Sequence, residues 1–286
     1  MGSPAWSNRE ASAIGGIALS NKAHKNDLTN VEKLSIREIK ELLEQEVADE
    51  LYPKLLFDSR KGVKRLAAQY EKSKMEQLSD EQRVKSLYAI EDDLAQSYEV
   101  IAGVDEAGRG PLAGPVVAAA VVLPSQIYIK KLNDSKKLSA VLRESLFKEI
   151  KQKSFYWSIA SVSAAEIDRI NILQASLEAM KRSVAKIEKI EHVLVDGKHR
   201  INNLEVEQTT IISGDARCAC IAAASVLAKV YRDDIMSELD KMYPVYGFKR
   251  NKGYPSKDHL AALLEYGPCP EHRISFEPIK SNFSRK

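Results

Sequence analysis

The hydrophobic pattern of the chain changes near residue 99. Before that point, apolar residues such as Ile36, Ile39 and Leu42 recur every three or four positions. This period is typical of amphipathic helices. After that point, short apolar runs alternate with longer helical periods. The pattern therefore predicts a small helical appendage over residues 31–98, followed by an α/β domain over residues 99–286.

Three helices are expected in the appendage. Ser35 and Glu38 have the spacing of a capping box at the start of the first helix. Pro53 interrupts the apolar period and separates the first helix from the second. The other two helices are expected at residues 54–74 and 78–98, the last starting at a second capping box of Ser79 and Gln82.

The second part of the chain predicts a mixed five-stranded sheet flanked by helices. Its short runs are rich in Val, Ile and Ala, and turn residues bound them. Strands are expected at residues 100–106, 115–124, 154–162, 191–196 and 207–213. Helices are expected at 140–152, 164–188, 215–241 and 256–266. The helices after residue 214 form a helical C-terminal part.

Composition places the chain among ordinary globular proteins, with 44% hydrophobic and 29% charged residues in 286. Its longest apolar runs, of about ten residues, are too short to span a bilayer. We expect no membrane segment and no signal peptide. Three cysteines without a paired framework indicate reduced thiols and a cytoplasmic location. Residues 1–30 are expected to be disordered or derived from an expression vector.

Positive charge is spread unevenly along the chain. Residues 99–286 hold 28 Lys and Arg against 23 Asp and Glu, an excess of five. The cations gather at Lys136-Lys137 and between Lys249 and Lys257, which is compatible with a polyanionic partner. In the appendage, Arg60, Lys61, Lys64 and Arg65 share roughly one helical face, which is either a solvated face or a nucleic-acid contact.

Two adjacent acids, Asp105 and Glu106, end an apolar run and are followed by a loop rich in glycine. Buried neighbouring carboxylates repel each other and need a compensating cation or proton. Glycine lets a backbone approach a ligand closely. Because successive strand residues face opposite sides, both acids can serve one site only if the strand ends or twists at Glu106.

Two further acids have positions suited to the same site. Asp196 ends an apolar run before Gly197, and Asp215 opens the long helix expected from residue 215. Each also has a structural alternative, Asp196 as a turn residue and Asp215 as a helix cap. Ligands that are all oxygen favour Mg²⁺ or Mn²⁺ over zinc. Cys218 and Cys220 would face different directions on that helix and are interpreted as packing residues.

Seven short motifs, which occur in order from about residue 100 to 279, resemble those of bacterial ribonuclease HII, a type 2 ribonuclease H. The helical appendage also resembles the N-terminal extension of Bacillus-like members. The resemblance implies the ribonuclease H-like fold for residues 99–286. The motifs are Gly103–Pro111, Asp134–Leu138, Val195–Gly197, Ser213–Asp215, Ala223–Asp233, Lys252–Pro255 and His272–Phe276.

The resemblance implies specific roles for individual residues. The catalytic and metal-binding acids are Asp105, Glu106, Asp196 and Asp215, acting with two Mg²⁺ or Mn²⁺ ions. Gly108, Arg109 and Gly110 would recognise the 2′-hydroxyl, and Tyr254 would stack on the next sugar. Further substrate contacts are expected from Lys136, Lys137, Ser225, Lys229 and Lys252, although solvated lysines and a serine bonded to its own helix are the alternatives.

The implied activity is that of a metal-dependent endoribonuclease. It would cut on the 5′ side of ribonucleotides in duplex DNA, and the RNA strand of RNA/DNA hybrids, leaving 3′-hydroxyl and 5′-phosphate ends. The implied role is removal of ribonucleotides from DNA by a monomer, with any protein partner of residues 31–98 unknown. The alternatives are a ribonuclease HIII-type enzyme, which would carry a sheet-containing N-terminal domain, and a catalytically silent hybrid-binding protein.

Overall fold

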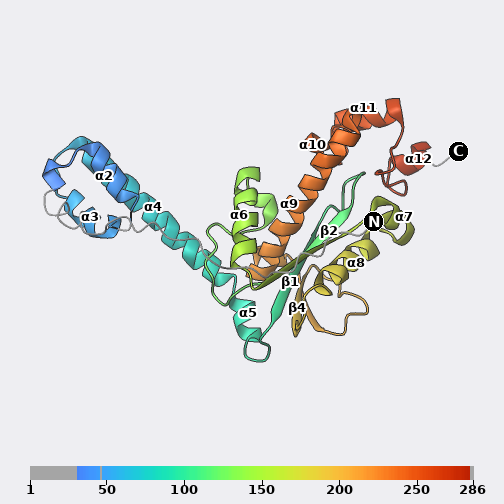
Figure 1. Cartoon of the computed structure of the whole chain (residues 1–286), viewed down its shortest axis with the longest axis horizontal. Helices are drawn as coiled ribbons and strands as arrows, with labels where there is room; N and C mark the ends of the chain where they lie inside the picture. Colours follow the sequence, from blue (N-terminus) through green and yellow to red (C-terminus); the bar gives the residue numbers. More distant parts are fainter. Residues whose placement is uncertain (1–30, 46, 284–286) are drawn as a thin grey trace, which may run out of the picture. The chain divides into compact units, whose positions relative to one another are not determined.

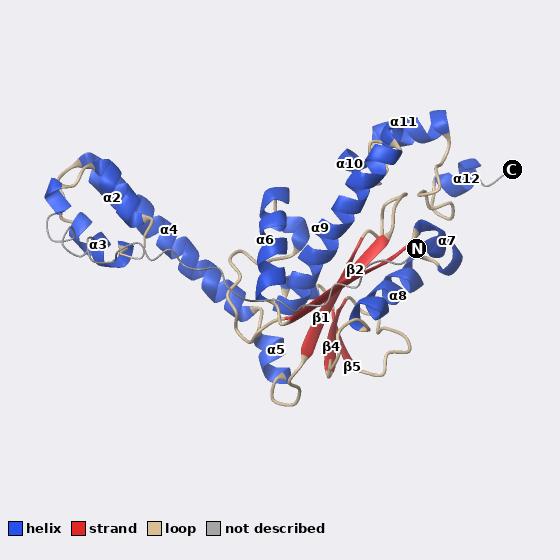
Figure 2. Cartoon of the chain, in the orientation of Figure 1, coloured by secondary structure: helices blue, strands red, loops and turns tan. Residues whose placement is uncertain are grey.

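Five strands form one mixed sheet in the order β3-β2-β1-β4-β5 (Figures 1 and 2). Strands β1, β2 and β3 are antiparallel neighbours, whereas β1, β4 and β5 run parallel. All five strands and the mixed sheet predicted from the sequence are therefore confirmed. The strands are β1 (Ile101–Ala107), β2 (Val116–Val122), β3 (Tyr156–Val162), β4 (His192–Asp196) and β5 (Glu207–Ile211).

The computed structural model describes residues 31–45 and 47–283, so the expectation for residues 1–30 lies outside it. The chain divides into two compact units between Leu78 and Ser79. The α-helices are α2 (Ile36–Leu43), α3 (Ala48–Leu55), α4 (Lys61–Ser86), α5 (Ala89–Leu94), α6 (Ala140–Lys153), α7 (Ala164–Ile170), α8 (Ile172–Val184), α9 (Ala219–Met242), α10 (Phe248–Asn251), α11 (Lys257–Tyr266) and α12 (Ile279–Phe283). Short 3₁₀ helices are η1 (Val31–Lys33), η2 (Ser135–Lys137), η3 (Gly214–Ala216) and η4 (Pro244–Tyr246).

Helices cover both faces of the sheet, α6 and α9 on one side and α7 and α8 on the other (Figure 1). Alternating residues of β2 divide between the two cores, because successive side chains of a strand face opposite sides. Val117 and Val121 pack with α9, whereas Val116 and Val122 pack with α8. The all-apolar sequence of β2 follows from this burial on both faces.

The long helix α9 lies unusually close to β1. A Cβ atom at Gly103 would lie 2.4 Å from the backbone of Cys220, so only glycine fits at this crossing. The next residue on the same face of β1 is Asp105, and it faces Ser225, one turn further along α9. The close approach of helix and strand therefore sets the depth at which Asp105 is buried.

The predicted helix boundaries are wrong at several places. The helix expected over residues 164–188 breaks at Asn171, which has a φ of 65° and caps α8 with its side chain. Pro53 lies inside α3, two residues before that helix ends, and the chain breaks after α2 instead. Ser79 lies within α4 and caps nothing, since that helix continues to Ser86.

Residues 31–78 form a small helical unit with its own apolar core. The predicted capping box of Ser35 and Glu38 at the start of α2 is confirmed. Arg60 is not part of a solvated cationic face, because its guanidinium pairs with Asp58 and donates to the carbonyl groups of Val31 and Leu34. The core comprises Val31, Ile39, Leu51, Leu55, Val63 and Ala67. None of the described helices of the protein is both long and apolar enough to cross a membrane.

A buried histidine pair ties α11 to the segment that follows it. The Nε2 atoms of His259 and His272 lie 3.0 Å apart. His272 Nδ1 accepts the N–H of Cys269, and His259 Nδ1 lies 2.8 Å from the carbonyl oxygen of Tyr254. This chain of bonds is complete only if both rings are neutral, with His272 Nε2–H donating to His259 and His259 Nδ1–H donating to Tyr254.

Low pH should lower the stability of this region, because it protonates His272. Burial and the nearby His259 lower the pKa of His272 to about 4, whereas an unfolded histidine titrates near 6.5. The unfolded chain therefore binds more protons between these values, so this contribution to stability is present above pH 6.5 and is lost as the pH falls toward 4. The loss should be about 2 kcal/mol.

Urea unfolding of the wild type and of His272→Asn at pH 7 and pH 4.5 measures this contribution. The substitution should lower stability at pH 7 and flatten the pH dependence. A matched control is His199→Asn, because His199 is exposed, and it should leave the slope unchanged. An equally steep pH dependence in His272→Asn would contradict the assignment.

Candidate active site

Two acids of the predicted site lie side by side near the end of β1. Asp105 pairs with Ala119 and Glu106 with Ala118 in a regular ladder that continues to Ala107. The strand therefore does not end at Glu106, and of the two predicted conditions, an end or a twist of the strand, only the twist remains. Asp105 is almost fully buried, and its carboxylate accepts the backbone N–H of Glu106.

The third acid, Asp196, is the last residue of β4, the parallel neighbour of β1. Its carboxylate accepts the N–H of Gly214 at 2.7 Å, which fixes the start of η3 against the end of the sheet. Asp215, the fourth acid, follows Gly214 in the chain and is buried within η3. Cys218, not Asp215, is the N-cap of α9, so the alternative of a capping role for Asp215 on that helix is wrong.

Burial and mutual repulsion make three of the carboxyl groups, those of Asp105, Glu106 and Asp196, unusually hard to ionise. Burial raises the pKa of Asp105 well above its ordinary value, and the charges of Glu106 and Asp196 raise it further. Burial also raises the pKa of Glu106, to which Asp196 adds, while Arg109 opposes the shift. The pKa of Asp196 is raised by burial and by Asp215. These interactions show that the acids share one electrostatic site.

Two basic side chains lie against the acids. Arg109 Nη1 is 3.2 Å from the carboxylate of Glu106, and Lys136 Nζ is 3.2 Å from that of Asp215. The ammonium of Lys136 loses hydration, but its pKa is raised because it also interacts with Asp215, Asp105 and Asp134. Part of the negative charge is therefore offset by flexible cations that come from the two loops beside the acids.

The donor set fits a hard divalent cation. All the ligand atoms are carboxylate oxygens, and a cation would relieve the repulsion that raises three of the pKa values. Within the described residues, no three of these four carboxylates bring ligand atoms within 4.8 Å of one another. The oxygens of these described acids are therefore not gathered into a single-ion cage.

The loop after β1 contains two glycines, Gly108 and Gly110, and only the first is required by the local structure. Gly108 has a φ of 98°, and a Cβ there would lie 2.0 Å from the guanidinium of Arg232. Gly110 has no such constraint, since a Cβ there would meet only Tyr254, at an ordinary 3.5 Å. Tyr254 is half exposed beside it. Gly110 and Tyr254 therefore form an open surface next to Glu106 and Arg109.

The remaining predicted contacts lie in different environments. Ser225 is buried, its hydroxyl bonds with that of Ser135, and it acts to lower the pKa of Asp105 against the effect of burial, so it supports an acid from inside the protein. Lys229 pairs with Asp233 on its own helix at 2.6 Å. Lys252 Nζ donates to Ser237 and to the carbonyl of Asp233. Lys137 is exposed.

Sequence analysis missed two buried arginines behind the loop. Arg232, on α9, donates to the carbonyl groups of Ala113, Pro115 and Lys252. Arg273 donates to those of Gly108, Arg109 and Gly114. Both residues belong to motifs noted in the sequence, but no hydrophobic period distinguishes a buried arginine from a surface one.

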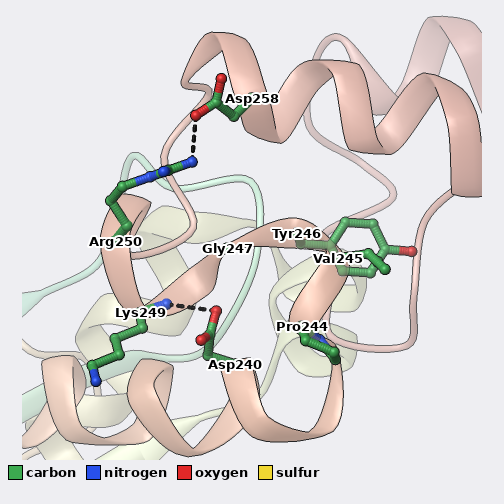
Figure 3. Close-up of a pocket in the computed structure, with 8 residues that line it drawn as sticks. All are labelled: Asp240, Pro244, Val245, Tyr246, Gly247, Lys249, Arg250 and Asp258. Carbon is green, nitrogen blue, oxygen red and sulfur yellow. Dashed lines mark hydrogen bonds and ion pairs between the residues drawn. The ribbon is translucent and has the colours of Figure 1, made fainter.

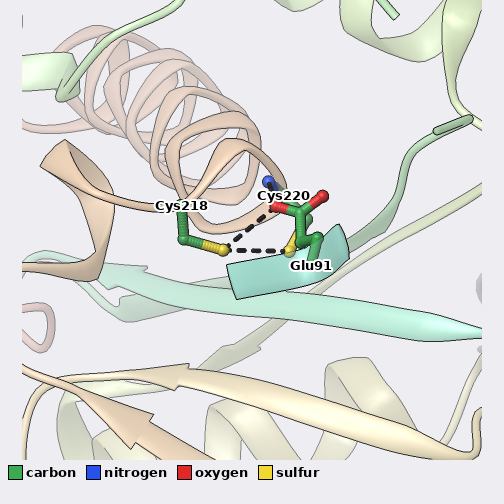
Figure 4. Close-up of side chains that lie close together, drawn as sticks. All are labelled: Glu91, Cys218 and Cys220. Carbon is green, nitrogen blue, oxygen red and sulfur yellow. Dashed lines mark hydrogen bonds between the residues drawn. The ribbon is translucent and has the colours of Figure 1, made fainter. Parts of the chain in front are cut away.

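A second group of metal-ligand types, Glu91, Cys218 and Cys220, lies within the described residues (Figure 4). The two sulfur atoms are 3.4 Å apart, so the expectation that they face different directions is wrong, because Cys218 precedes the helix. Glu91 accepts the N–H of Cys220 and the thiol of Cys218. Burial raises the pKa of both thiols, and we interpret the group as a cap for α9.

A hollow of about 560 Å³ lies in the C-terminal part of the chain (Figure 3). Arg250 pairs across it with Asp258, and Asp240 accepts the N–H of Lys249. It is separate from the acids, since none of the predicted site residues is among those that line it: Asp240, Pro244, Val245, Tyr246, Gly247, Lys249, Arg250 and Asp258.

Comparisons with known proteins agree on one family. Residues 102–279 match the family model described as ribonuclease HII, and residues 35–95 match that of the ribonuclease HII N-terminal domain. Ribonuclease HII of Desulfitobacterium hafniense (strain DSM 10664 / DCB-2) is 45% identical over 254 residues, which cover 88% of this chain and 98% of the relative.

Comparison with solved structures supports the same family at the level of the fold. Ribonuclease H2 of Pyrococcus horikoshii OT3 is 27% identical, with a TM-score of 0.55 over 64% of this chain and 96% of its own. Ribonuclease HII of Archaeoglobus fulgidus, solved in a complex with PCNA, is 27% identical, with a TM-score of 0.52 over 63% and 96%. The predicted ribonuclease H-like fold is confirmed, and the chain belongs to the ribonuclease HII family.

Proposed function

We propose that this chain is an endoribonuclease that hydrolyses the phosphodiester bond on the 5′ side of ribonucleotides embedded in duplex DNA. It also cuts the RNA strand of RNA/DNA hybrids, and leaves 3′-hydroxyl and 5′-phosphate ends. The observation that carries the proposal is the convergence of four acids, three of them with raised pKa values, from β1, β4 and η3. Such a cluster is expected at a catalytic site rather than at a silent binding surface.

Ribonucleases of this family depend on metal ions. Asp105, Glu106, Asp196 and Asp215 would hold two Mg²⁺ or Mn²⁺ ions, for which carboxylate oxygens are the preferred ligands. When bound, two such ions activate a water molecule and stabilise the leaving oxygen of a phosphodiester. The N–H of Gly214 would keep Asp196 oriented by the bond it already makes, and the N–H of Glu106 would do the same for Asp105; the nearby hydroxyl of Ser225 favours the ionised form of Asp105.

Arg109 and Lys136 would contact the phosphates of the substrate. Each lies on the rim of the acid site, and each now pairs with one acid, Glu106 or Asp215. Their side chains are largely exposed and flexible, so they can turn from a carboxylate to a phosphate. Lys137, Lys229 and Lys252 would add weaker, salt-dependent contacts along the duplex.

Recognition of the ribose would take place at Gly110 and Tyr254. Gly110 is open to solvent, and the lack of a side chain there is not required by internal packing. A 2′-hydroxyl can therefore approach its backbone closely. The ring of Tyr254, beside Gly110, would stack on the next sugar and favour deoxyribose there, so that the enzyme selects the RNA-to-DNA junction.

The enzyme would act in the cytoplasm as a monomer with residues 99–286 as the catalytic domain. Three cysteines without disulfide bonds are consistent with a reducing compartment. The Archaeoglobus relative forms a complex with PCNA. For residues 31–98 of this chain, the part available to a protein partner would be residues 31–78, because Leu87 and Tyr88 are buried in the core of the second unit. Cleavage of a duplex with one ribonucleotide, run beside a continuous hybrid with and without Mg²⁺, tests the proposal; no metal-dependent cleavage of either would refute it.

Replacing Asp105 by Asn should separate catalysis from stability. Cleavage should fall by about a thousandfold, because several kcal/mol of charge stabilisation is lost. Without metal at pH 7.5 the variant should melt a few degrees higher, about 2–4 °C for each kcal/mol. The reason is that the raised pKa of Asp105 makes its charged form unfavourable to the fold.

The gain in melting temperature should shrink as the pH falls. The native pKa of Asp105 lies above the unfolded one, so the unfavourable charge is present at high pH and is removed by protonation in acid. Differential scanning calorimetry of the wild type and Asp105→Asn in EDTA at pH 7.5 and pH 4.5 measures this difference in melting temperature. Near-normal turnover, or a metal-free Tm that falls, would be inconsistent with the assignment.

The two loop glycines should respond differently to alanine. Gly108→Ala should lower the free energy of unfolding by about 1–3 kcal/mol, owing to its positive φ and the contact with Arg232. Gly110→Ala should change stability by no more than about 0.5 kcal/mol but raise KM for a duplex with one ribonucleotide. Urea unfolding and steady-state kinetics distinguish the two, and a wild-type KM in Gly110→Ala would exclude close approach there.

Loss of the Tyr254 ring should reduce junction selection. Tyr254→Ala should cleave a single embedded ribonucleotide about tenfold more slowly, on the scale of one aromatic stacking contact, and a continuous hybrid should be affected less. Tyr254→Phe keeps the ring and serves as the control, with near-normal rates expected. If Tyr254→Ala retains the parent ratio of the two rates, the tyrosine has no part in selection.

A further inference from the structure

One buried guanidinium joins both ends of the loop that follows β1. Arg273 Nη2 donates to the carbonyl of Gly108 at 2.6 Å, and Nη1 donates to that of Arg109 at 2.9 Å. Nε and Nη2 also donate to the carbonyl of Gly114, at 3.0 and 2.8 Å. The side chain is fully buried, so four hydrogen bonds fix three peptide groups of this loop from the inside.

These bonds determine where the amide groups of the loop point. The carbonyl of Gly108 and the N–H of Arg109 belong to one planar trans peptide, in which the two groups point in opposite directions. The same holds for the carbonyl of Arg109 and the N–H of Gly110. Because Arg273 holds both carbonyls inward, both N–H groups are directed away from it, toward the exposed side of the loop.

The two N–H groups are free to bind a ligand oxygen. Within residues 31–45 and 47–283, neither the N–H of Arg109 nor that of Gly110 donates a hydrogen bond. Both residues are exposed beside Tyr254, and Arg109 contacts Glu106 at the rim of the acid site. Two adjacent N–H groups that point outward can both donate to one acceptor oxygen atom of a ligand.

The segment that carries Arg273 is itself held firmly. Its N–H donates to the carbonyl of Leu112, and the carbonyl of Glu271 accepts the N–H of Gly114. On the other side, Asp168 accepts the N–H groups of Ile274 and Ser275 at 2.8 and 2.9 Å. The guanidinium therefore acts from a fixed point and does not follow the loop.

The charge of Arg273 is unusual for its position. Among the residues that the structure describes, no carboxylate accepts a hydrogen bond from it; its partners there are backbone carbonyls, with the ring of Phe276 5.0 Å away. Burying a cation without an anion is costly, and an apolar residue would fill the same space at a lower cost. Orientation of the loop gives a reason for keeping it.

We propose that Arg273 is a specificity-determining positioning residue, which holds the carbonyls of Gly108 and Arg109 inward so that the N–H groups of Arg109 and Gly110 meet the ribose 2′-hydroxyl. This rests on the proposed function, since it assigns the 2′-hydroxyl to that loop. Arg273 does not touch the substrate; it acts through the loop.

The test is Arg273→Lys, which keeps the charge but cannot bridge three carbonyls with one ammonium group. Binding is measured by fluorescence anisotropy in Ca²⁺ to two duplexes that differ only in one 2′-hydroxyl. The wild type should prefer the ribonucleotide duplex. Arg273→Lys should lose about tenfold of that preference, on the scale of one or two hydrogen bonds, while its affinity for the all-DNA duplex stays the same.

Arg232→Lys is the matched control. Arg232 is equally buried and also donates to three carbonyls, but none of them belongs to Gly108 or Arg109. It should melt at a lower temperature and keep the wild-type preference. A purely structural role for Arg273 predicts that both variants lose stability and neither loses preference, and that result would overturn the inference.

Failure of the inference differs from failure of the proposed function. If the wild type neither cleaves nor prefers the ribonucleotide duplex, the proposed function fails; if it does both and Arg273→Lys keeps the preference, only the inference fails. Should Arg273→Lys not fold by circular dichroism, Asp168→Asn loosens the same segment without entering the loop. It should lose about threefold of the preference, and an unchanged preference would overturn the inference.

Discussion

Repulsion among buried carboxylates is the interaction on which the arrangement of this protein depends. Burial and neighbouring charges raise the pKa values of Asp105, Glu106 and Asp196. Apolar packing alone cannot hold such a group together, since it removes the water that stabilises the charges. The structure supplies three kinds of compensation: the buried hydroxyl of Ser225, backbone N–H groups, and the two cations Arg109 and Lys136 on the rim.

The topology of the sheet brings these acids together. Strands β1 and β4 are parallel neighbours, so their carboxyl ends, with Asp105 and Asp196, meet at one edge of the sheet. The long helix α9 then crosses β1 so closely that only Gly103 fits, which brings Ser225 to Asp105. Residues far apart in the sequence thus converge on one point because the sheet and one helix are packed tightly.

The strands, and the positions of Asp105, Glu106 and Asp196 near strand ends, could be predicted from sequence, because strand ends and local spacing are short-range properties. The structural surroundings of Asp215 and Ser225 could not be predicted so well. The 3₁₀ turn that carries Asp215 and the buried bonds of Ser225 are set by tertiary packing. Arg232 and Arg273 are harder still, since all but one of their partners lie more than a hundred residues away along the chain. No local pattern in the sequence predicts a contact between residues so far apart.

The glycine loop shows that a sequence motif alone does not reveal the structural reason for each of its residues. Gly108 is required by a positive φ and by Arg232, whereas Gly110 is not required by anything inside the protein. A loop that presents two free amides has lost the hydrogen bonds that usually fix a backbone. Its order must then come from its carbonyls, and a buried guanidinium with several donors in one plane can hold several of them at once. Exposure of the amides and burial of Arg273 are therefore two parts of the same structural solution.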